Sequence, residues 1–364
     1  MEKKIARVLA FYLPQYHPIP ENDIWWGKGF TEWTNVGKAR PLFKGHYQPH
    51  VPADLGYYDL RVPEVREQQV EMARYAGIEG FVYYHYWFAG KRLLERPFNE
   101  VLNWGKPDFP FCLAWANETW SGIWHGDANR ILIEQTYPGR ADFEKHFYTV
   151  LPAFLDKRYI RVANKPLFFI YRPFQLPNPK EFICYWNDLA IKNGLEGIHF
   201  VANTYSAEQT VQALEVGFDA VNTYWLKKAM SEISLVQTYW NSISSKFLKG
   251  LFKSPVYKYD KMMDFFSDEL DANPDYYPTV LTGWDNSPRS GHRGLILKGY
   301  TPQTFANHLK KVIEKVEQKP EEKRIIFMKS WNEWAEGNYV EPDLKFGWKF
   351  LDVLRDTLIQ NVAR

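Results

Sequence analysis

The stretch RIIFMKSW, residues 324–331, is a nearly unbroken run of apolar residues. Seven further runs of this kind, rich in β-branched and aromatic residues, recur along the chain. They are ARVLAFYL (6–13), GFVYYHYW (80–87), FPFCLAW (109–115), PLFFIYR (166–172), IHFVAN (198–203), AVNTYW (220–225) and PTVLTGW (278–284). Strands of a parallel sheet that is covered on both faces show such continuous runs, because neither face meets water. The eight runs therefore predict eight parallel strands.

The segments between these runs have the periodicity of amphipathic helices. Residues 301–316 contain one apolar stripe, made of Phe305, Leu309, Val312 and Val316. Similar patterns occupy 64–77, 140–156, 178–194 and 348–358. Eight strands that alternate with helices predict an α/β fold, a (β/α)8 TIM barrel, as a single domain over residues 1–364. Long connections are expected at 14–62, 116–140 and 226–260.

A doubly wound open sheet is the alternative fold. It requires a glycine-rich phosphate-binding loop directly after the first strand. The residues at that place, FYLPQYHPIP (11–20), contain no glycine. The barrel is therefore preferred.

Charge and composition limit the classes of partner. The chain has 45 basic and 43 acidic side chains and a net charge of +2, so no general attraction to nucleic acid or to an anionic membrane is expected. No stretch is long enough to span a bilayer, and Pro14 and Gln15 interrupt the first apolar run before it forms a signal-peptide core. Cys112 and Cys184 both have apolar sequence neighbours and are expected to be reduced core residues. These features predict a cytoplasmic protein.

Polar and aromatic residues gather at the ends of the predicted strands, where the active site of such a barrel lies. They are Tyr12, Gln15, His85, Tyr86, Trp115, Asn117, Glu118, Tyr171, Arg172, Asn203, Tyr205, Tyr224, Trp225, Trp284, Asp285, Trp331, Asn332, Glu333 and Glu336. Aromatic faces stack on sugar rings, while amides and carboxylates bind hydroxyl groups. The set predicts a site for an oligosaccharide or polysaccharide. For any single ring the competing interpretation is burial in the core.

The stretch SWNEWAEGNYVEP (330–342) follows the last predicted strand and contains three glutamates. On one turn of helix, Glu333 and Glu336 would lie close together on the same face. Two carboxylates at this distance suit cleavage of a glycosidic bond, in which one stays ionised and the other donates a proton. Trp331 and Trp334 would supply the apolar wall that favours the protonated acid. The structural alternative is that Asn332 caps a short helix and the glutamates favour its positive end. Glu341 is expected to support the site or contact substrate.

Four longer motifs carry a resemblance to a known family. FYLPQYHPIPENDIWWGKGFTEWTNV (11–36), YYHYWF (83–88), WANETW (115–120) and SWNEWAEG (330–337) resemble the WbsX-like family of polysaccharide-associated proteins. That family is related to glycoside hydrolase family 99, the endo-α-mannosidases and endo-α-mannanases. The resemblance covers nearly the whole chain and implies a (β/α)8 barrel and a metal-independent retaining glycosidase.

The resemblance also implies roles for the glutamate pair. Family 99 enzymes have paired glutamates in a NEW-x-EG stretch, and Glu333 and Glu336 match those positions. Glu333 would remove the proton of the substrate 2-hydroxyl, which attacks the anomeric carbon to give a 1,2-anhydro sugar. Glu336 would act first as acid and then as base. Ala335 stands where the mannosidases usually have His, which leaves the identity of the sugar open.

Several alternatives remain at this stage. No cofactor and no metal are expected, because His46 and His50 do not form an HExxH helix and no Cys/His cluster has zinc spacing. An acid and a nucleophile from different strands, Glu118 with Glu333, is a second catalytic scheme. A glycan-biosynthetic glycosyltransferase or transglycosylase is the alternative function, although neither a pyrophosphate loop nor a suitably placed DxD motif is present. A lectin-like barrel is a third interpretation, which the glutamate pair disfavours.

Overall fold

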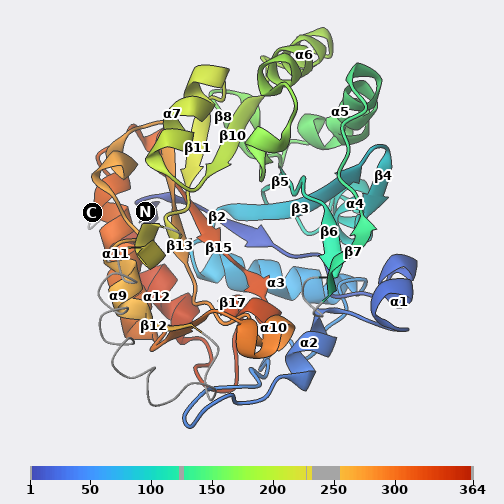
Figure 1. Ribbon diagram of the computed structural model, residues 1–364. Helices are drawn as coiled ribbons and strands as arrows, with labels where there is room; N and C mark the ends of the chain where they lie inside the picture. The colour runs from blue at the N-terminus through green and yellow to red at the C-terminus, as the bar shows by residue number, and fades with distance from the viewer. Residues whose placement is uncertain (1, 123–126, 227, 232–254, 362–364) are drawn as a thin grey trace.

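Eight parallel strands form the centre of the molecule, at the eight apolar runs of the sequence (Figure 1). They are β2 (Arg7–Tyr12), β3 (Gly80–Phe88), β5 (Phe111–Trp115), β9 (Lys165–Ile170), β10 (His199–Thr204), β11 (Ala220–Thr223), β13 (Tyr276–Leu281) and β15 (Ile325–Lys329). The computed structural model describes residues 2–122, 127–226, 228–231 and 255–361. Nearly every residue of these strands is buried, which is why the runs are apolar without alternation.

The strands close into a barrel. Each pairs in parallel with the next along the chain, β9 pairs with β10, and β15 returns to pair with β2. The open-sheet alternative is therefore wrong and the TIM-like barrel is confirmed. Gly80 shows how closely the chain packs at the start of β3, since a Cβ there would lie 2.4 Å from the carbonyl oxygen of Pro110.

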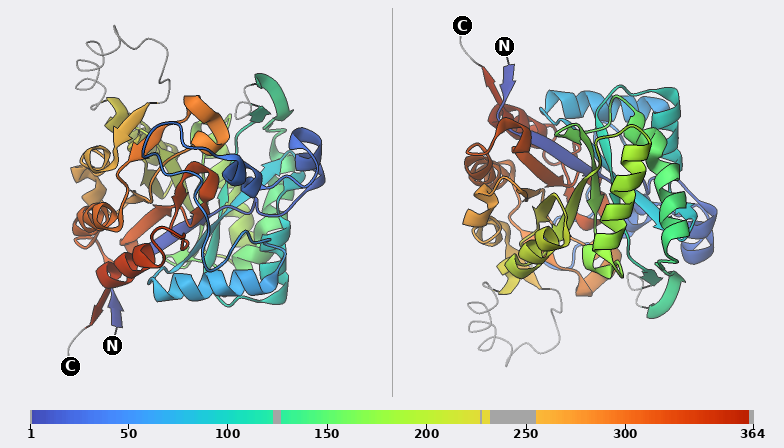
Figure 2. Two further views of the ribbon diagram at one scale, coloured as in Figure 1. Left: turned by 90° about the horizontal axis from the view of Figure 1, so that it is seen from below. Right: turned by 90° about the horizontal axis from the view of Figure 1, so that it is seen from above.

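Helices surround the barrel on its outer face (Figure 2). The larger ones are α3 (Pro63–Tyr75), α4 (Arg96–Trp104), α5 (Arg140–Leu155), α6 (Pro179–Lys192), α7 (Ala207–Val216), α11 (Pro302–Val316) and α12 (Lys349–Leu358). All five predicted helical segments are among them. In α11 the Thr301 side chain accepts a hydrogen bond from the backbone N–H of Thr304 and Pro302 begins the first turn, so the sequence fixes where this helix starts. Its predicted apolar stripe is buried against the barrel.

Shorter elements decorate this frame. They are β1 (Glu2–Lys4), α1 (Pro20–Trp26), α2 (Glu32–Lys38), β4 (Lys91–Leu93), β6 (Trp120–Gly122), β7 (Asp127–Ile133), β8 (Arg161–Val162), β12 (Val256–Lys258), α9 (Tyr259–Met263), α10 (Ser287–Ser290), β14 (Ile296–Lys298), β16 (Asn332–Glu333), β17 (Asn338–Tyr339) and β18 (Ile359–Asn361). β1 and β18 pair antiparallel, so the two ends of the described chain lie side by side (Figure 2).

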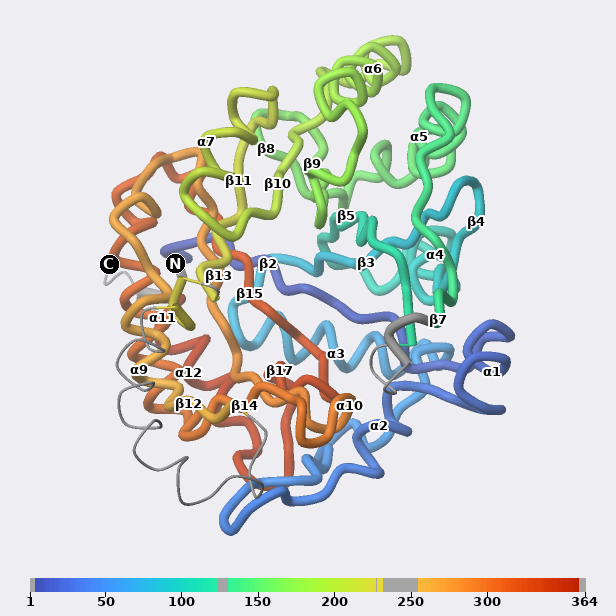
Figure 3. The backbone as a smooth tube through the Cα atoms, in the orientation of Figure 1, coloured from blue at the N-terminus to red at the C-terminus, as the bar shows by residue number. Residues whose placement is uncertain are grey.

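The long connections build one end of the barrel. The connection after β2 forms α1 and α2, and the connection after β5 forms the β6–β7 hairpin. Figure 3 shows the blue N-terminal connection running beside α10 and β17, which come from the C-terminal part of the chain. Contacts join α2, α10 and the 3-10 turn at Trp334–Glu336. The third expected connection, 226–260, lies largely outside the described residues.

The two cysteines and the helices bear on two further predictions. Cys112 is buried, as expected, but Cys184 is exposed, because it lies on the outer face of α6. In the part of the chain that the structure describes, no helix is both long and apolar enough to cross a membrane.

Candidate active site

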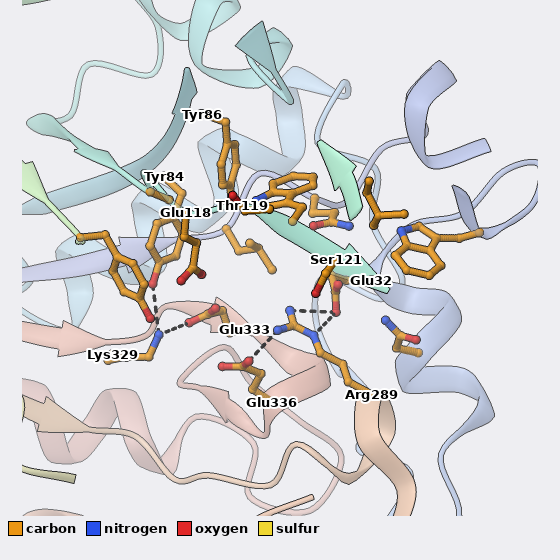
Figure 4. A pocket seen from close by; sticks show the side chains of 18 of the residues that line it. Glu32, Tyr84, Tyr86, Glu118, Thr119, Ser121, Arg289, Lys329, Glu333 and Glu336 are labelled. Carbon is orange, nitrogen blue, oxygen red and sulfur yellow. Dashed lines mark hydrogen bonds and ion pairs between the residues drawn. The ribbon is translucent and has the colours of Figure 1, made fainter. Parts of the chain in front are cut away.

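A cavity of about 510 Å³ opens at the carboxyl ends of the strands (Figure 4). Its aromatic walls consist of Trp26, Phe30, Tyr84, Tyr86, Trp120, Tyr171 and Trp284. Its charged groups are Glu32, Glu118, Arg172, Arg289, Lys329, Glu333 and Glu336. Eight of the predicted site residues therefore meet in one cavity: Gln15, Tyr86, Glu118, Tyr171, Arg172, Trp284, Glu333 and Glu336.

Glu333 is bound by a lysine at the carboxyl end of the last barrel strand. Lys329 ends β15, and its Nζ lies 3.0 Å from Oε2 of Glu333 and donates a 3.1 Å hydrogen bond to the Tyr84 hydroxyl. Burial disfavours the Lys329 ammonium, but the Glu333 carboxylate and the surrounding tyrosines hold its pKa well above its usual range. Lys329 is therefore charged and forms an ion pair with Glu333.

Glu336 lies in a different electrostatic setting. Its Oε1 is 2.6 Å from Nη1 of Arg289, and the same guanidinium lies 3.2 Å from Oε2 of Glu32 through Nη2. Burial raises the pKa of Glu336; Arg289 acts in the opposite direction, but the neighbouring Glu333 adds to the rise, and the net direction is upward. Figure 4 shows both glutamates of the pair directed into the cavity, each toward its own cation.

The local backbone differs from the helical turn that the spacing predicted. Glu333 ends the short strand β16, which pairs antiparallel with β17, and a 3-10 turn then carries Glu336. Gly337 closes this turn with φ +59°, where a Cβ would lie 2.9 Å from the Asp285 backbone nitrogen. A glycine is thus required for the chain to pass the connection that follows β13.

Asn332 does not cap a helix, so that structural alternative is wrong. Its side chain accepts a 2.7 Å hydrogen bond from the backbone N–H of Leu13 and donates one to the carbonyl oxygen of the same residue. It also donates to the Tyr58 hydroxyl. Asn332 therefore fixes the glutamate segment to the end of β2 and does not line the cavity.

A second ion pair lies elsewhere in the cavity. Oε2 of Glu118 lies 2.9 Å from Nη2 of Arg172, whose Nη1 donates a 3.0 Å hydrogen bond to Tyr205. Both side chains are about one-third exposed, so this pair contacts solvent. Asn117 stays buried beneath it, where it bonds to the Arg172 backbone and to Tyr137.

Four predicted binding residues point away from the cavity. Tyr12 donates its hydroxyl to Gln69 of α3, and His85 contacts His146 of α5 through Nε2, 2.8 Å away. The Trp115 ring packs against His146 and Phe182, and Trp331 is fully buried against Phe81. Tyr12, His85 and Trp115 face the helix layer, because successive residues of a strand point to opposite faces.

The remaining predicted residues also lie outside the 510 Å³ cavity. Asn203 and Tyr224 line a small second cavity of about 10 Å³, which Lys329 also lines. Asp285 faces another cavity of about 260 Å³, where His46 binds it at 2.7 Å and Gln48 at 2.8 Å. Glu341 is buried, accepts hydrogen bonds from Tyr58, Gln69 and Trp334, and does not line the 510 Å³ cavity. Of its two expected roles, this position agrees with support of the site and not with substrate contact.

The prediction that Trp331 and Trp334 form the apolar wall beside the glutamate pair is also wrong. Trp334 stacks on Tyr339 with 3.8 Å between ring centroids and, like Trp331, does not line the cavity. Trp284 and Phe30 line it in their place.

Sequence reasoning missed several cavity residues. Lys329 stood inside a predicted strand, and a lysine in an otherwise apolar run was an available signal. Glu32 lies within the motif 11–36, but nothing marked it out from its neighbours. Arg289 lies in α10, a helix of four residues that is too short to show a periodic pattern, and gave no signal. Among the described residues, no group of three or more His, Cys, Asp or Glu side chains is arranged to hold a metal ion.

Solved structures with a similar fold include a GH99 endo-alpha-mannosidase from Bacteroides thetaiotaomicron. Its structure alone has a TM-score of 0.59 and 15% identity, covering 96% of this chain and 95% of that one. Its complex with bis-tris-propane has a TM-score of 0.56 and 16% identity, covering 96% and 94%. A glycoside hydrolase-like protein has a TM-score of 0.61 and 13% identity, covering 99% and 95%. At these identities the likeness shows the fold alone.

Sequence relatives give the family. Two proteins of Xanthomonas campestris pv. campestris, from strains B100 and ATCC 33913 and both named Uncharacterized protein WxcX, are 38% identical over 359 residues. The match covers 97% of this chain and 50% of each relative, so the chain spans about half the length of these curated relatives. The family model described as Glycosyltransferase WbsX matches residues 8–354, from β2 to α12. The chain belongs to the WbsX glycosyltransferase family.

Proposed function

We propose that this protein is a retaining glycoside hydrolase that cleaves an α-linked, mannose-like glycan. One observation carries the proposal: two buried glutamates face one cavity in unlike electrostatic settings. Glu333 is paired with a charged lysine, which suits a base, and the pKa of Glu336 is raised, mainly by burial, which suits an acid. The description of the family and the fold of the mannosidase support a carbohydrate substrate.

The proposed reaction follows the scheme that the resemblance implies. Glu333 takes the proton of the substrate 2-hydroxyl as this oxygen attacks the anomeric carbon. The bond to the leaving oxygen breaks, that oxygen takes the proton of Glu336, and a 1,2-anhydro sugar forms. Glu336, now ionised, removes a proton from water, which opens the anhydro ring at the anomeric carbon. O2 then recovers its proton from Glu333, and the two inversions give net retention.

The cavity favours an uncharged sugar. Each of its three cations already binds a carboxylate: Lys329 binds Glu333, Arg172 binds Glu118, and Arg289 binds Glu32 and Glu336. A uronic acid or a nucleotide diphosphate would bring further negative charge to these carboxylates and would have to break an ion pair. Seven aromatic rings supply faces for stacking on a neutral sugar.

The test compares α-linked glycans with and without the 2-hydroxyl. The intact substrate should be cleaved with retention, and the 2-deoxy or 2-fluoro substrate should be inert and leave no covalent adduct. Removing the hydroxyl removes the nucleophile, whereas an ordinary retaining enzyme would form a glycosyl ester on a carboxylate. A 2-fluoro sugar found by mass spectrometry on Glu333 or Glu118 contradicts the participation scheme and supports the two-strand pair.

The description of the family as a glycosyltransferase favours one second candidate, transfer of the cleaved sugar to an acceptor glycan. The first step is the same, and an acceptor hydroxyl then replaces water. Incubation with labelled acceptor oligosaccharides separates the two, because transfer gives a longer labelled product and hydrolysis does not. A requirement for a nucleotide sugar would contradict both.

A further inference from the structure

Arg289 joins two carboxylates that come from distant parts of the sequence. Glu32 begins α2 and Glu336 lies in the 3-10 turn after β16, while Arg289 lies in α10 (Figure 4). Glu32 and Glu336 are buried and Arg289 is largely so, with exposed side-chain fractions of 4% for Glu32, 7% for Glu336 and 11% for Arg289. One guanidinium therefore faces two carboxylates inside the protein.

The arginine does not serve the two carboxylates equally. Nε and Nη2 both point to Oε2 of Glu32 at 3.2 Å, whereas Nη1 alone points to Glu336, at 2.6 Å. If both glutamates were ionised, the trio would carry an uncompensated negative charge, which is costly in a buried site. Lys329 also acts on Glu336, but its ammonium group is bound to Glu333 at 3.0 Å.

Two further charged groups act on Glu336, and they have opposite signs. Glu333 of β16 is a like charge, and Lys329 of β15 is the second cation. Glu336 also interacts electrostatically with the tyrosine hydroxyls of Tyr84 and Tyr224. Within the described part of the chain, two cations, Arg289 and Lys329, and two carboxylates, Glu32 and Glu333, act on Glu336. An ionised Glu336 would therefore be a third carboxylate for two cations.

We propose that Glu32 is a positioning residue that competes with Glu336 for Arg289, so that Glu336 holds the proton it gives to the leaving oxygen. This inference rests on the proposed function, in which Glu336 is the acid. Glu32 itself does not have to touch the scissile bond. The pKa of Glu336 is raised, first by burial and against the effect of Arg289, which agrees with an ionised Glu32 and a protonated Glu336.

The test is the Glu32→Gln variant. The amide oxygen can still accept hydrogen bonds from Arg289 but carries no charge, so the full positive charge of Arg289 acts on Glu336. The alkaline limb of the kcat/KM profile should then move to lower pH. On the alkaline side, kcat/KM falls tenfold for each pH unit by which the limb moves. An unmoved limb overturns the proposal.

The matched control is Glu100→Gln. Glu100 on α4 is another arginine-bound, largely buried glutamate, paired with Arg66 and Arg96, and it does not line the cavity. The Glu100→Gln substitution should leave the alkaline limb of the kcat/KM profile at its original pH. If Glu100→Gln moves the limb as far as Glu32→Gln does, the effect is a general one of lost charge and the proposal is wrong.

A titration followed by NMR of ¹³C-labelled glutamate needs no substrate, and its first reading comes from the unaltered protein. In the unaltered protein, Glu336, assigned with Glu336→Gln, should titrate above ordinary glutamate, and Glu32→Gln should lower its midpoint. A Glu336 that titrates at or below the ordinary value overturns the proposal. The two failures are distinguishable: a midpoint that moves without any glycan cleavage contradicts the proposed function, and cleavage with an unmoved midpoint contradicts the role of Glu32.

Discussion

Glu333 and Glu336 are three positions apart, but their surroundings predict different responses to the same substitution. Glu333→Gln should be inactive on every substrate, because the 2-hydroxyl then has no base. Glu336→Gln should lose about 10²- to 10⁴-fold in kcat on natural glycans and much less on substrates with good leaving groups, since acid assistance then matters little. Steady-state kinetics on a series of aryl glycosides measures both.

The matched control for these variants is Glu118→Gln, which removes another cavity glutamate. It should retain the leaving-group dependence of the unaltered enzyme, because Glu118 is paired with Arg172 and not with the glutamate pair. If Glu118→Gln is inactive while Glu336→Gln keeps full activity on natural glycans, the acid comes from the third barrel strand and the assignment is wrong.

Glu341 predicts a pH effect on stability. Burial raises its pKa from 4.5 to about 7 in the folded protein, although Trp334, Gln69 and Tyr58 donate hydrogen bonds that oppose the rise. The folded state therefore holds a proton that the unfolded chain releases, and stability is lost as pH rises from 4.5 through about 7. Glu341→Gln, which cannot ionise, should lack this loss.

The measurement is thermal unfolding of both proteins between pH 4 and pH 8. The stability of the unaltered protein relative to Glu341→Gln should fall between about pH 4.5 and pH 7 and then stay level. A constant difference across this range would mean that folding does not raise the pKa of Glu341, which contradicts the prediction.

Strand positions could be predicted from the sequence, but strand orientation could not. All eight runs form strands because burial on both faces makes them apolar throughout. The same uniformity hides which residues face the barrel interior. In β3, Tyr84 and Tyr86 line the cavity while His85 between them contacts α5. The position of a strand end in the sequence therefore predicts which residues lie near the site. Which of these side chains point into the cavity can be seen only in the structure.

A pair of tryptophans tests this distinction. Trp284 follows β13 and lines the cavity, whereas Trp115 ends β5 and packs beneath α5 and α6. Trp284→Ala should raise KM several-fold with a modest change in melting temperature, since it removes a stacking face. Trp115→Ala should cost about 3–5 kcal/mol of unfolding free energy, because it leaves a cavity in the core. The reverse pattern in binding and unfolding assays would place Trp115 in the site.

Closure of the barrel explains why loop residues were the hardest to predict. Glu32, Arg289 and Glu336 meet because α2, α10 and the turn after β16 cover one end of a closed ring of strands. Local patterns could find Glu336, which belongs to a compact motif, but no local pattern connects positions 32 and 289. The charge balance of the site is thus a property of the fold.

That charge balance also predicts that catalysis is independent of metal ions. Every carboxylate of the cavity already has a cationic partner within 3.2 Å: Lys329, Arg172 or Arg289. A divalent ion would have to displace a buried or partly buried ion pair to reach these oxygens, and displacement leaves an unpaired charge behind. Prolonged dialysis against a strong chelator should therefore leave kcat and KM unchanged. The control is addition of Mg²⁺, Mn²⁺, Ca²⁺ and Zn²⁺ singly to the dialysed enzyme. Activity lost on dialysis and restored by one of these ions would show that a metal, and not Lys329 or Arg289, balances the catalytic carboxylates.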